Sequence, residues 1–119
     1  MIPSTAPVGK ETIDPADIVD FIIDLSPLLE AGEEFATITF AVPPESAALG
    51  FRVMTEAPYA PLEIDDSHLR IWVSVEPGSA ALPAWNGSGT VCAIEFTATT
   101  DSTPPRQHQR TIAIRVAQK

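Results

Sequence analysis

The sequence has a single cysteine, two histidines and one tyrosine, and it contains no apolar run long enough to cross a membrane. One cysteine permits no disulfide within the chain, and Cys92 falls on the apolar phase of an expected strand, so we expect a buried core thiol. Residues 1–13 lack the basic and apolar regions of a secretory signal. We therefore expect no membrane partner, and a protein that is made and used without export.

Basic residues are also scarce, because 7 Lys and Arg stand against 16 Asp and Glu, for a net charge of −9. Residues 1–66 hold 13 acids and 2 bases, whereas residues 67–119 hold 3 acids and 5 bases. An acidic chain repels phosphate, so we expect no nucleic-acid partner. A solvated acidic surface explains the asymmetry, which would also let the acidic part of one copy meet the basic part of another.

Residues that carry catalytic or metal chemistry are too few to define a site. The nearest set is Asp65, Asp66 and His68, and such a run is more typical of a solvated turn than of a ligand cluster. The sequence contains no calcium-binding loop, no nucleophile elbow and no glycine-rich phosphate loop. We therefore expect no enzyme activity, no cofactor and no metal ion.

Short segments of alternating apolar and polar residues are abundant. In residues 35–43, for example, Ala36, Ile38 and Phe40 share one phase and are expected to face the core together. Turn-forming residues separate these segments, and none has the length of an ordinary helix. Two antiparallel sheets packed face to face would bury the apolar sets. This pattern predicts an all-β sandwich of about seven strands, at residues 18–25, 35–43, 49–56, 62–64, 68–75, 90–100 and 109–117.

A segment without periodicity precedes the first strand. Residues 1–13 contain Pro3, Pro7 and many small residues, so we predict an extended N-terminal arm at 1–13 and a folded domain at 14–119. Extended arms commonly add a strand to a neighbouring molecule, although a terminus without any role has the same composition. The apolar residues of this arm are candidates for a protein interface, and they are Ile2, Val8 and Ile13.

The first strand has an unusual outward phase. Ile18 and Ile22 alternate there with Asp20 and Asp24, which makes the outer face half apolar. An outer strand face that meets only water is normally polar. We therefore include Ile18 and Ile22 among the interface candidates, with the arm, a loop or another subunit as the cover.

Two aromatic residues complete the set of interface candidates. Trp72 lies on the outward phase of residues 68–75 beside Arg70, where it either anchors a partner or is covered by a loop of its own chain. Trp85 and Leu82 lie in the long loop at residues 76–89. Loops of this length are often functional, and the alternative is that this loop folds back onto the core.

Several short motifs occur in a fixed order over most of residues 14–117. The pattern resembles a family of small structural proteins of tailed bacteriophages, described as fiber–tail adaptors or minor virion proteins. It departs from the family at Leu25 and Phe40, where the family has Trp, and the segment between Ser74 and Thr90 is longer than the family's turn. The motifs that carry the resemblance are "DPADIVDFIIDLS" at 14–26, "AGEE" at 31–34, "ATITFAVP" at 36–43, "IWVS" at 71–74 and "RTIAIRV" at 110–116.

The resemblance implies an immunoglobulin-like β-sandwich with a structural role in a virion, present in many symmetry-related copies. The implied partners are other virion proteins of the tail, fiber, portal region or capsid. The implied location is the virion, which is assembled in the cytoplasm of the bacterial host. An adaptor that joins fibers to the tail or to the head–tail region is the first hypothesis, and a capsid cement or decoration protein is the alternative. From another class, a carbohydrate-binding sandwich would use Tyr59, Trp72 and Trp85.

Overall fold

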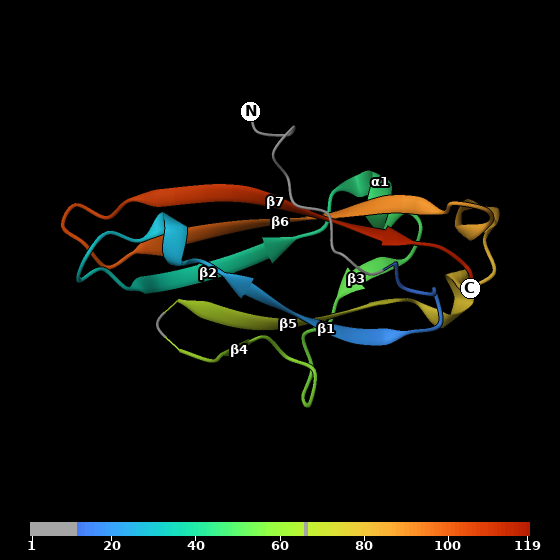
Figure 1. Cartoon of the computed structure of the whole chain (residues 1–119), viewed down its shortest axis with the longest axis horizontal. Coiled ribbons are helices and arrows are strands. Elements are labelled where there is room, and N and C mark those ends of the chain that lie inside the picture. The colour runs from blue at the N-terminus through green and yellow to red at the C-terminus, as the bar shows by residue number, and fades with distance from the viewer. Residues whose placement is uncertain (1–11, 66) are drawn as a thin grey trace.

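A computed structural model describes residues 12–65 and 67–119. Within these residues the chain forms two antiparallel sheets that lie one above the other as layers (Figure 1). In the first sheet, β5 pairs with β1 on one side and with two short strands on the other. The strands of this sheet are β1 (Ile18–Asp24), β5 (His68–Val75), β3 (Phe51–Val53) and β4 (Leu62–Glu63).

The second sheet has β6 at its centre, between β2 and β7. The orders β1-β5-β3 and β2-β6-β7 match strands B-E-D and C-F-G of an immunoglobulin domain. The predicted all-β sandwich of about seven strands is therefore confirmed. The strands of this second sheet are β2 (Phe35–Ala41), β6 (Thr90–Thr100) and β7 (Gln107–Val116).

The core lies between the layers, because alternate residues of the long central strands point inward. Burial alternates residue by residue over most of β5 and β6, as the sequence pattern predicted. Cys92 is fully buried, and desolvation raises the pKa of its thiol to about 11. The inward side chains of the three longest strands are Leu69, Ile71, Val73, Val75, Cys92, Ile94, Phe96, Ala98, Ile114 and Val116.

The predicted phase of residues 35–43 is wrong at its first residues. The β2–β6 register shifts between Phe35 and Thr37, and Ala36 is exposed while Phe35 packs against the core. A bulge adds one residue to a strand without a partner, so the side chains before it change faces. Ile38 and Phe40, which follow the bulge, pack against the core as expected.

The remaining elements are short. One four-residue helix, α1 (Pro44–Ala47), contacts β3 and β6, and the hydroxyl of Ser46 accepts a hydrogen bond from Ala93 N at 3.0 Å. This bond satisfies a backbone group of β6 where the helix meets the sheet. Three single 3-10 turns lie in the loops, at Ser26–Leu28, Pro77–Ser79 and Pro83–Trp85.

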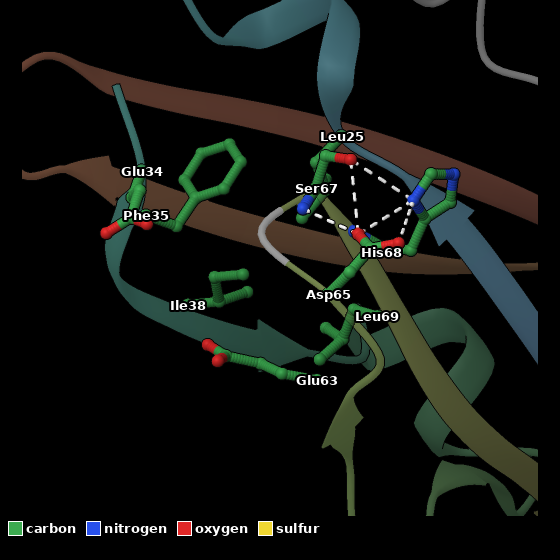
Figure 2. A pocket seen from close by; sticks show the side chains of 9 residues that line it. All are labelled: Leu25, Glu34, Phe35, Ile38, Glu63, Asp65, Ser67, His68 and Leu69. Carbon is green, nitrogen blue, oxygen red and sulfur yellow. Dashed lines mark hydrogen bonds and ion pairs between the residues drawn. The ribbon is translucent and has the colours of Figure 1, made fainter. Parts of the chain in front are cut away.

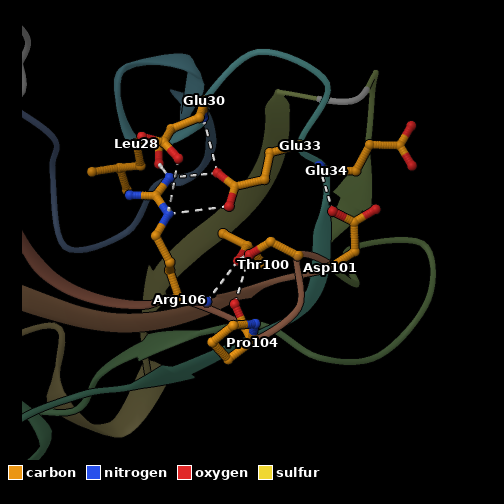
Figure 3. Close-up of polar contacts among 9 residues, drawn as sticks. Leu28, Glu30, Glu33, Glu34, Thr100, Asp101, Pro104 and Arg106 are labelled. Atoms are coloured by element: carbon orange, nitrogen blue, oxygen red, sulfur yellow. Dashed lines mark hydrogen bonds and ion pairs between the residues drawn. The ribbon is translucent and has the colours of Figure 1, made fainter.

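One end of the sandwich is held by a charged clamp (Figure 3). The Arg106 guanidinium donates hydrogen bonds to both carboxylate oxygens of Glu33 and, at 3.0 Å, to the carbonyl of Leu28. The Glu33 side chain is almost fully buried, and the hydrogen bond from Arg106 holds its pKa well below its usual range. The clamp joins the β1–β2 connection to the β6–β7 hairpin, so it fixes two loops that are far apart in the sequence.

Candidate protein interface

The outer face of the first sheet carries most of the exposed large apolar side chains in the described part of the chain. Ile18 and Ile22 of β1 are 47% and 55% exposed, as the outward phase predicted. Leu62 of β4 and Ile64, which follows it, are 58% and 45% exposed. Ile64 continues the β4–β5 ladder, because its N–H donates to the His68 carbonyl at 2.9 Å. These four residues with Arg70 and Trp72 between them are called the apolar face below.

The strand register arranges these side chains in rows across the sheet. Ile22 lies opposite Arg70, and Arg70 lies opposite Leu62 on its other side. Neighbouring residues across antiparallel strands have Cβ atoms about 5 Å apart, so Ile22 and Leu62 flank the aliphatic stem of Arg70. The row is therefore one continuous apolar strip with a single charge at its centre.

The charge of Arg70 is balanced within the same sheet. Arg70 Nε lies 3.2 Å from Asp20 Oδ2 and makes no linear hydrogen bond, so the contact is an ion pair. Trp72, which lies opposite Asp20, is half-buried. Tyr59 covers it edge-on, with the ring centroids 5.2 Å apart and the planes at 66°. The loop that covers Trp72 is therefore the one before β4, and Trp72 presents only part of its ring to a partner.

A polar cluster borders the apolar face at the end of β1 (Figure 2). His68 Nδ1 lies 2.9 Å from Asp65 Oδ1, and His68 Nε2 lies 3.6 Å from Asp24 Oδ1. The hydrogen bond with Asp65 raises the pKa of His68, and hydrogen bonds from the Ser67 N–H and from His68 lower the pKa of Asp65 to about 2. The cluster therefore joins the β4–β5 turn to β1 by charge-assisted contacts.

The same cluster contains a serine, a histidine and an aspartate, but their geometry differs from that of a catalytic triad. Ser67 Oγ lies 3.1 Å from His68 Nδ1, the nitrogen that also contacts Asp65. A triad needs the nucleophile and an orienting carboxylate on opposite ring nitrogens, each within hydrogen-bond distance. Asp24 is the carboxylate on the opposite nitrogen, Nε2, but at 3.6 Å it is too distant for that hydrogen bond. The adjoining cavity is small, with a volume of about 80 Å³. Its wall includes Leu25, Phe35, Ile38 and Glu63 (Figure 2).

A larger hollow lies between β2 and β3. It has a volume of about 570 Å³, and its wall is mainly apolar, with Phe40, Phe51 and Val53 among the lining residues. Arg52 and Glu76 are its charged members. In the described residues, no three His, Cys, Asp or Glu side chains group closely enough to hold a metal ion.

Two predicted interface residues lie in the core. Ile13 is 3% exposed and Trp85 is fully buried, so neither is available to a partner while the domain is folded. Ile13 pairs with Val116 of β7, which moves the start of the folded domain to Ile13 or earlier. The Trp85 Nε1–H donates to the Ser79 carbonyl at 2.8 Å, so the loop at residues 76–89 folds back onto the core. For Trp85 this is the alternative that the sequence left open. Ile13 is corrected from an arm residue to a core residue, because burial of an apolar side chain is favourable in an irregular segment as well.

The other predicted residues fall into three groups. Ile18, Ile22, Arg70 and Trp72 come together on the apolar face. Leu82 is half-buried and packs against the core, and Ile2 and Val8 lie outside the described residues. Leu62 and Ile64 were missed as interface residues, although both belong to a predicted short strand. Their spacing of two residues, which puts both on one face, was the available signal.

Comparison with known proteins found no family model, no curated protein and no solved structure that matches the chain. Among the described residues, no helix is long and apolar enough to span a membrane. The geometry of the apolar face is therefore the main structural guide to function.

Proposed function

We propose that this chain is a non-enzymatic structural protein of a tailed-phage virion, where it joins fibers to the tail or to the head–tail region. The observation that carries this proposal is the apolar face, where Ile18, Ile22, Leu62 and Ile64 stay exposed on one side of a single sheet. Contiguous apolar surface on a folded domain marks a contact site for another macromolecule. The sequence resemblance to fiber–tail adaptors supplies the class of that partner, other virion proteins.

The chemistry of the face suits a protein partner. Protein interfaces are enriched in aromatic residues and arginine at their centres, and depleted of lysine. Arg70 and the partly covered Trp72 lie at the centre of this face, and the described residues on it include no lysine. The Asp20–Arg70 ion pair places a negative and a positive group side by side on this face. A partner with complementary charges would therefore bind in one orientation.

Repetition would compensate for the small size of the face. Four exposed side chains on one sheet give a contact below the size of a stable pairwise interface. In a symmetric assembly each copy is held by several such contacts, and the second contact forms at a high effective concentration. The chain would therefore act in multiple copies in the virion, after assembly in the cytoplasm of the host.

The two alternatives receive unequal support. A capsid cement protein would use the same fold and the same apolar face against a different lattice. A carbohydrate-binding module needs open aromatic platforms, and of its three aromatic candidates Trp85 is fully buried. Trp72 and Tyr59 are both half-buried and pack edge-on against each other, so the two rings do not form one flat platform for a sugar.

The deciding experiment is to purify the parent virus and locate this chain in a cryo-EM map of the particle. Density at the tail, collar or fiber base, with Ile22 and Leu62 against a neighbouring protein, would support the adaptor. Density across the icosahedral shell would instead identify a cement protein. Absence from the particle would overturn both structural roles.

A further inference from the structure

The first sheet has an open edge at β1. In an immunoglobulin domain of the constant type, the corresponding sheet has four strands in the order A-B-E-D. Here β1 stands at the position of strand B, and β5 is its only strand partner in the described residues. The position of strand A is therefore unfilled by any residue from 12 to 65 or from 67 to 119.

The backbone of β1 is ready to accept a strand. The Leu25 N–H donates to the Ser67 carbonyl at 2.7 Å, so the odd-numbered residues of β1 turn their polar groups toward β5. The even-numbered residues turn theirs toward the open edge, and their side chains lie on the apolar face. These residues are Ile18, Asp20, Ile22 and Asp24.

The segment that precedes the domain leaves from the other sheet. Ile13 N–H donates to Arg115 O at 3.1 Å, and Ala117 N–H donates to Ile13 O at 2.9 Å, so odd-numbered residues face β7 there. Pro3 and Pro7 are also odd-numbered, and proline has no N–H to donate. Extending this pairing along β7 would place Pro7 where a donor is required. Pairing through even-numbered residues would turn both prolines away from the partner strand, which an edge position tolerates.

We propose that the open edge of β1 accepts residues 1–11 of a second copy as an added antiparallel strand. The choice of a second copy rests on the proposed function, in which many copies assemble together. The register that sets Lys10 opposite Asp20 also sets Val8 opposite Ile22, so charge and apolar surface match at once. In this register Ala6 lies opposite Asp24, and its N–H points into the ladder.

The path of the chain favours a second copy over the same copy. Ile13 is fixed to β7, whereas β1 belongs to the opposite layer. The layers of a sandwich are about 10 Å apart and an extended residue spans about 3.3 Å, so about three residues would be needed to cross. Three steps back from Ile13 bring the chain to the opposite layer at Lys10, even when it crosses straight. Lys10 would then lie at the bend between the crossing and the added strand, and not within an extended strand opposite Asp20. Donation between copies leaves all of residues 1–11 free to pair.

A matched pair of proline substitutions tests whether the even-numbered residues of the added strand form the hydrogen bonds with β1. Ala6→Pro removes an N–H that the ladder uses, whereas the neighbouring Thr5→Pro removes one that points away. We expect self-association of the full chain, measured by sedimentation velocity up to about 1 mM, to weaken about tenfold in Ala6→Pro and to stay unchanged in Thr5→Pro. Equal behaviour of the two variants, or a monomeric wild-type chain throughout this range, would overturn the proposal.

A mixing experiment identifies the donor. Ile22→Pro blocks the accepting edge but spares the β1–β5 ladder, because the Ile22 N–H faces outward; Ile22→Thr is its control and keeps that N–H. Ile22→Pro keeps an intact donor strand, and Ala6→Pro keeps an intact accepting edge. We expect their equimolar mixture to form a 1:1 complex at concentrations at which each variant alone is monomeric. A mixture that stays monomeric, with Ala6→Pro less stable than wild type, would assign the strand to its own copy and overturn the proposal.

Folding of each variant is checked by circular dichroism and thermal unfolding. If Ile22→Pro fails to fold, the Ala6→Pro and Thr5→Pro comparison still decides, since neither substitution touches a described residue. The outcome is separable from the proposed function. Complex formation on mixing, with the chain absent from the particle, would refute only the virion role, and a tail position without complex formation would refute only the strand exchange.

Discussion

The two sheets of the sandwich have outer faces of opposite chemistry. On the second sheet the register sets Thr39 opposite Thr97 and Thr37 opposite Thr99, so hydroxyl groups cover much of that face. On the first sheet one outward row is Ile22, Arg70 and Leu62. The first face is called apolar above, and the second is called the threonine face below.

Strand formation alone does not explain this difference. Threonine and isoleucine are both branched at Cβ and both favour strands, so either residue would build either sheet. Strand propensity therefore does not account for the outward isoleucines of β1. The threonine face shows that an outer sheet face of this domain can form from side chains that carry hydroxyl groups.

The first prediction concerns the inner faces of the two sheets, and it compares how much a core residue of each sheet contributes to the free energy of unfolding. Ile71 of the first sheet and Ile94 of the second are both fully buried. Ile71→Ala and Ile94→Ala are each expected to lower the free energy of unfolding by about 2–5 kcal/mol, because each leaves a cavity in one shared core. Urea denaturation measures both. A cost below about 1 kcal/mol for one variant alone would mean that the sheets are not equal partners in the core.

The second prediction concerns the clamp, which belongs to neither outer face. The pKa of Glu33 is lowered from its ordinary value of 4.5, so the stability it supplies is present above pH 4.5 and is lost as the pH falls below it. Glu33→Gln should lower the melting temperature at pH 7 and flatten its decline under acid. Thermal unfolding from pH 7 to pH 2 measures this, with Glu34→Gln as the neighbouring control. Parallel acid profiles for wild type and Glu33→Gln would contradict the role of the clamp.

The third prediction exchanges the chemistry of the two faces. Ile22→Thr with Leu62→Thr on the apolar face should change the free energy of unfolding by about 0.5 kcal/mol or less, while raising solubility and weakening association. Thr39→Ile with Thr97→Ile on the threonine face should lower solubility at similar stability. Precipitation by polyethylene glycol and sedimentation velocity measure the two effects. If the first pair destabilises the isolated domain strongly, the apolar face is part of the fold and not a contact surface.

The smallest expected effect is at the border of the apolar face. The pKa of His68 is raised above its ordinary value of 6.5 by Asp65, so the stability it supplies is full below pH 6.5 and is lost as the pH rises through its folded pKa. His68→Gln should remove a slight fall in melting temperature above pH 6.5. Thermal unfolding at pH 5.5 and pH 8.5 tests this. An identical fall in wild type and in His68→Gln would show that another group titrates.

Regular alternation made the long strands predictable. The range expected for β5, residues 68–75, agrees with His68–Val75, and the outward position of Ile18 and Ile22 was read from phase alone. A period of two fixes faces wherever the strand has no irregularity. The bulge at Phe35 broke that rule, because a local extra residue leaves no mark on composition.

The irregular segments were harder to predict, since tertiary packing alone decides which of their side chains are buried. Trp85 sits between Pro83 and Gly87 in a loop, and its burial depends on space left at the end of the sandwich. Ile13 joined the core through a bridge to Val116, a residue more than a hundred positions away. Leu62 and Ile64 joined the apolar face because β4 pairs with β5, and sequence spacing does not reveal which strands pair.

The bridge between Ile13 and β7 also has a mechanical consequence. Ile13 runs parallel to β7 and is held by two hydrogen bonds, one to Arg115 and one from Ala117. A pull on the residues before Thr12 along this direction loads both bonds at once, in shear, whereas a pull across the sheet would break them one after the other. The backbone N–H of Lys119 also donates to Asp14 Oδ2 at 2.8 Å, so the last residue of the chain shares the same anchor point. Tension that enters through the first residues would thus reach β7, at the edge of the second sheet, before it reaches β1 along the chain.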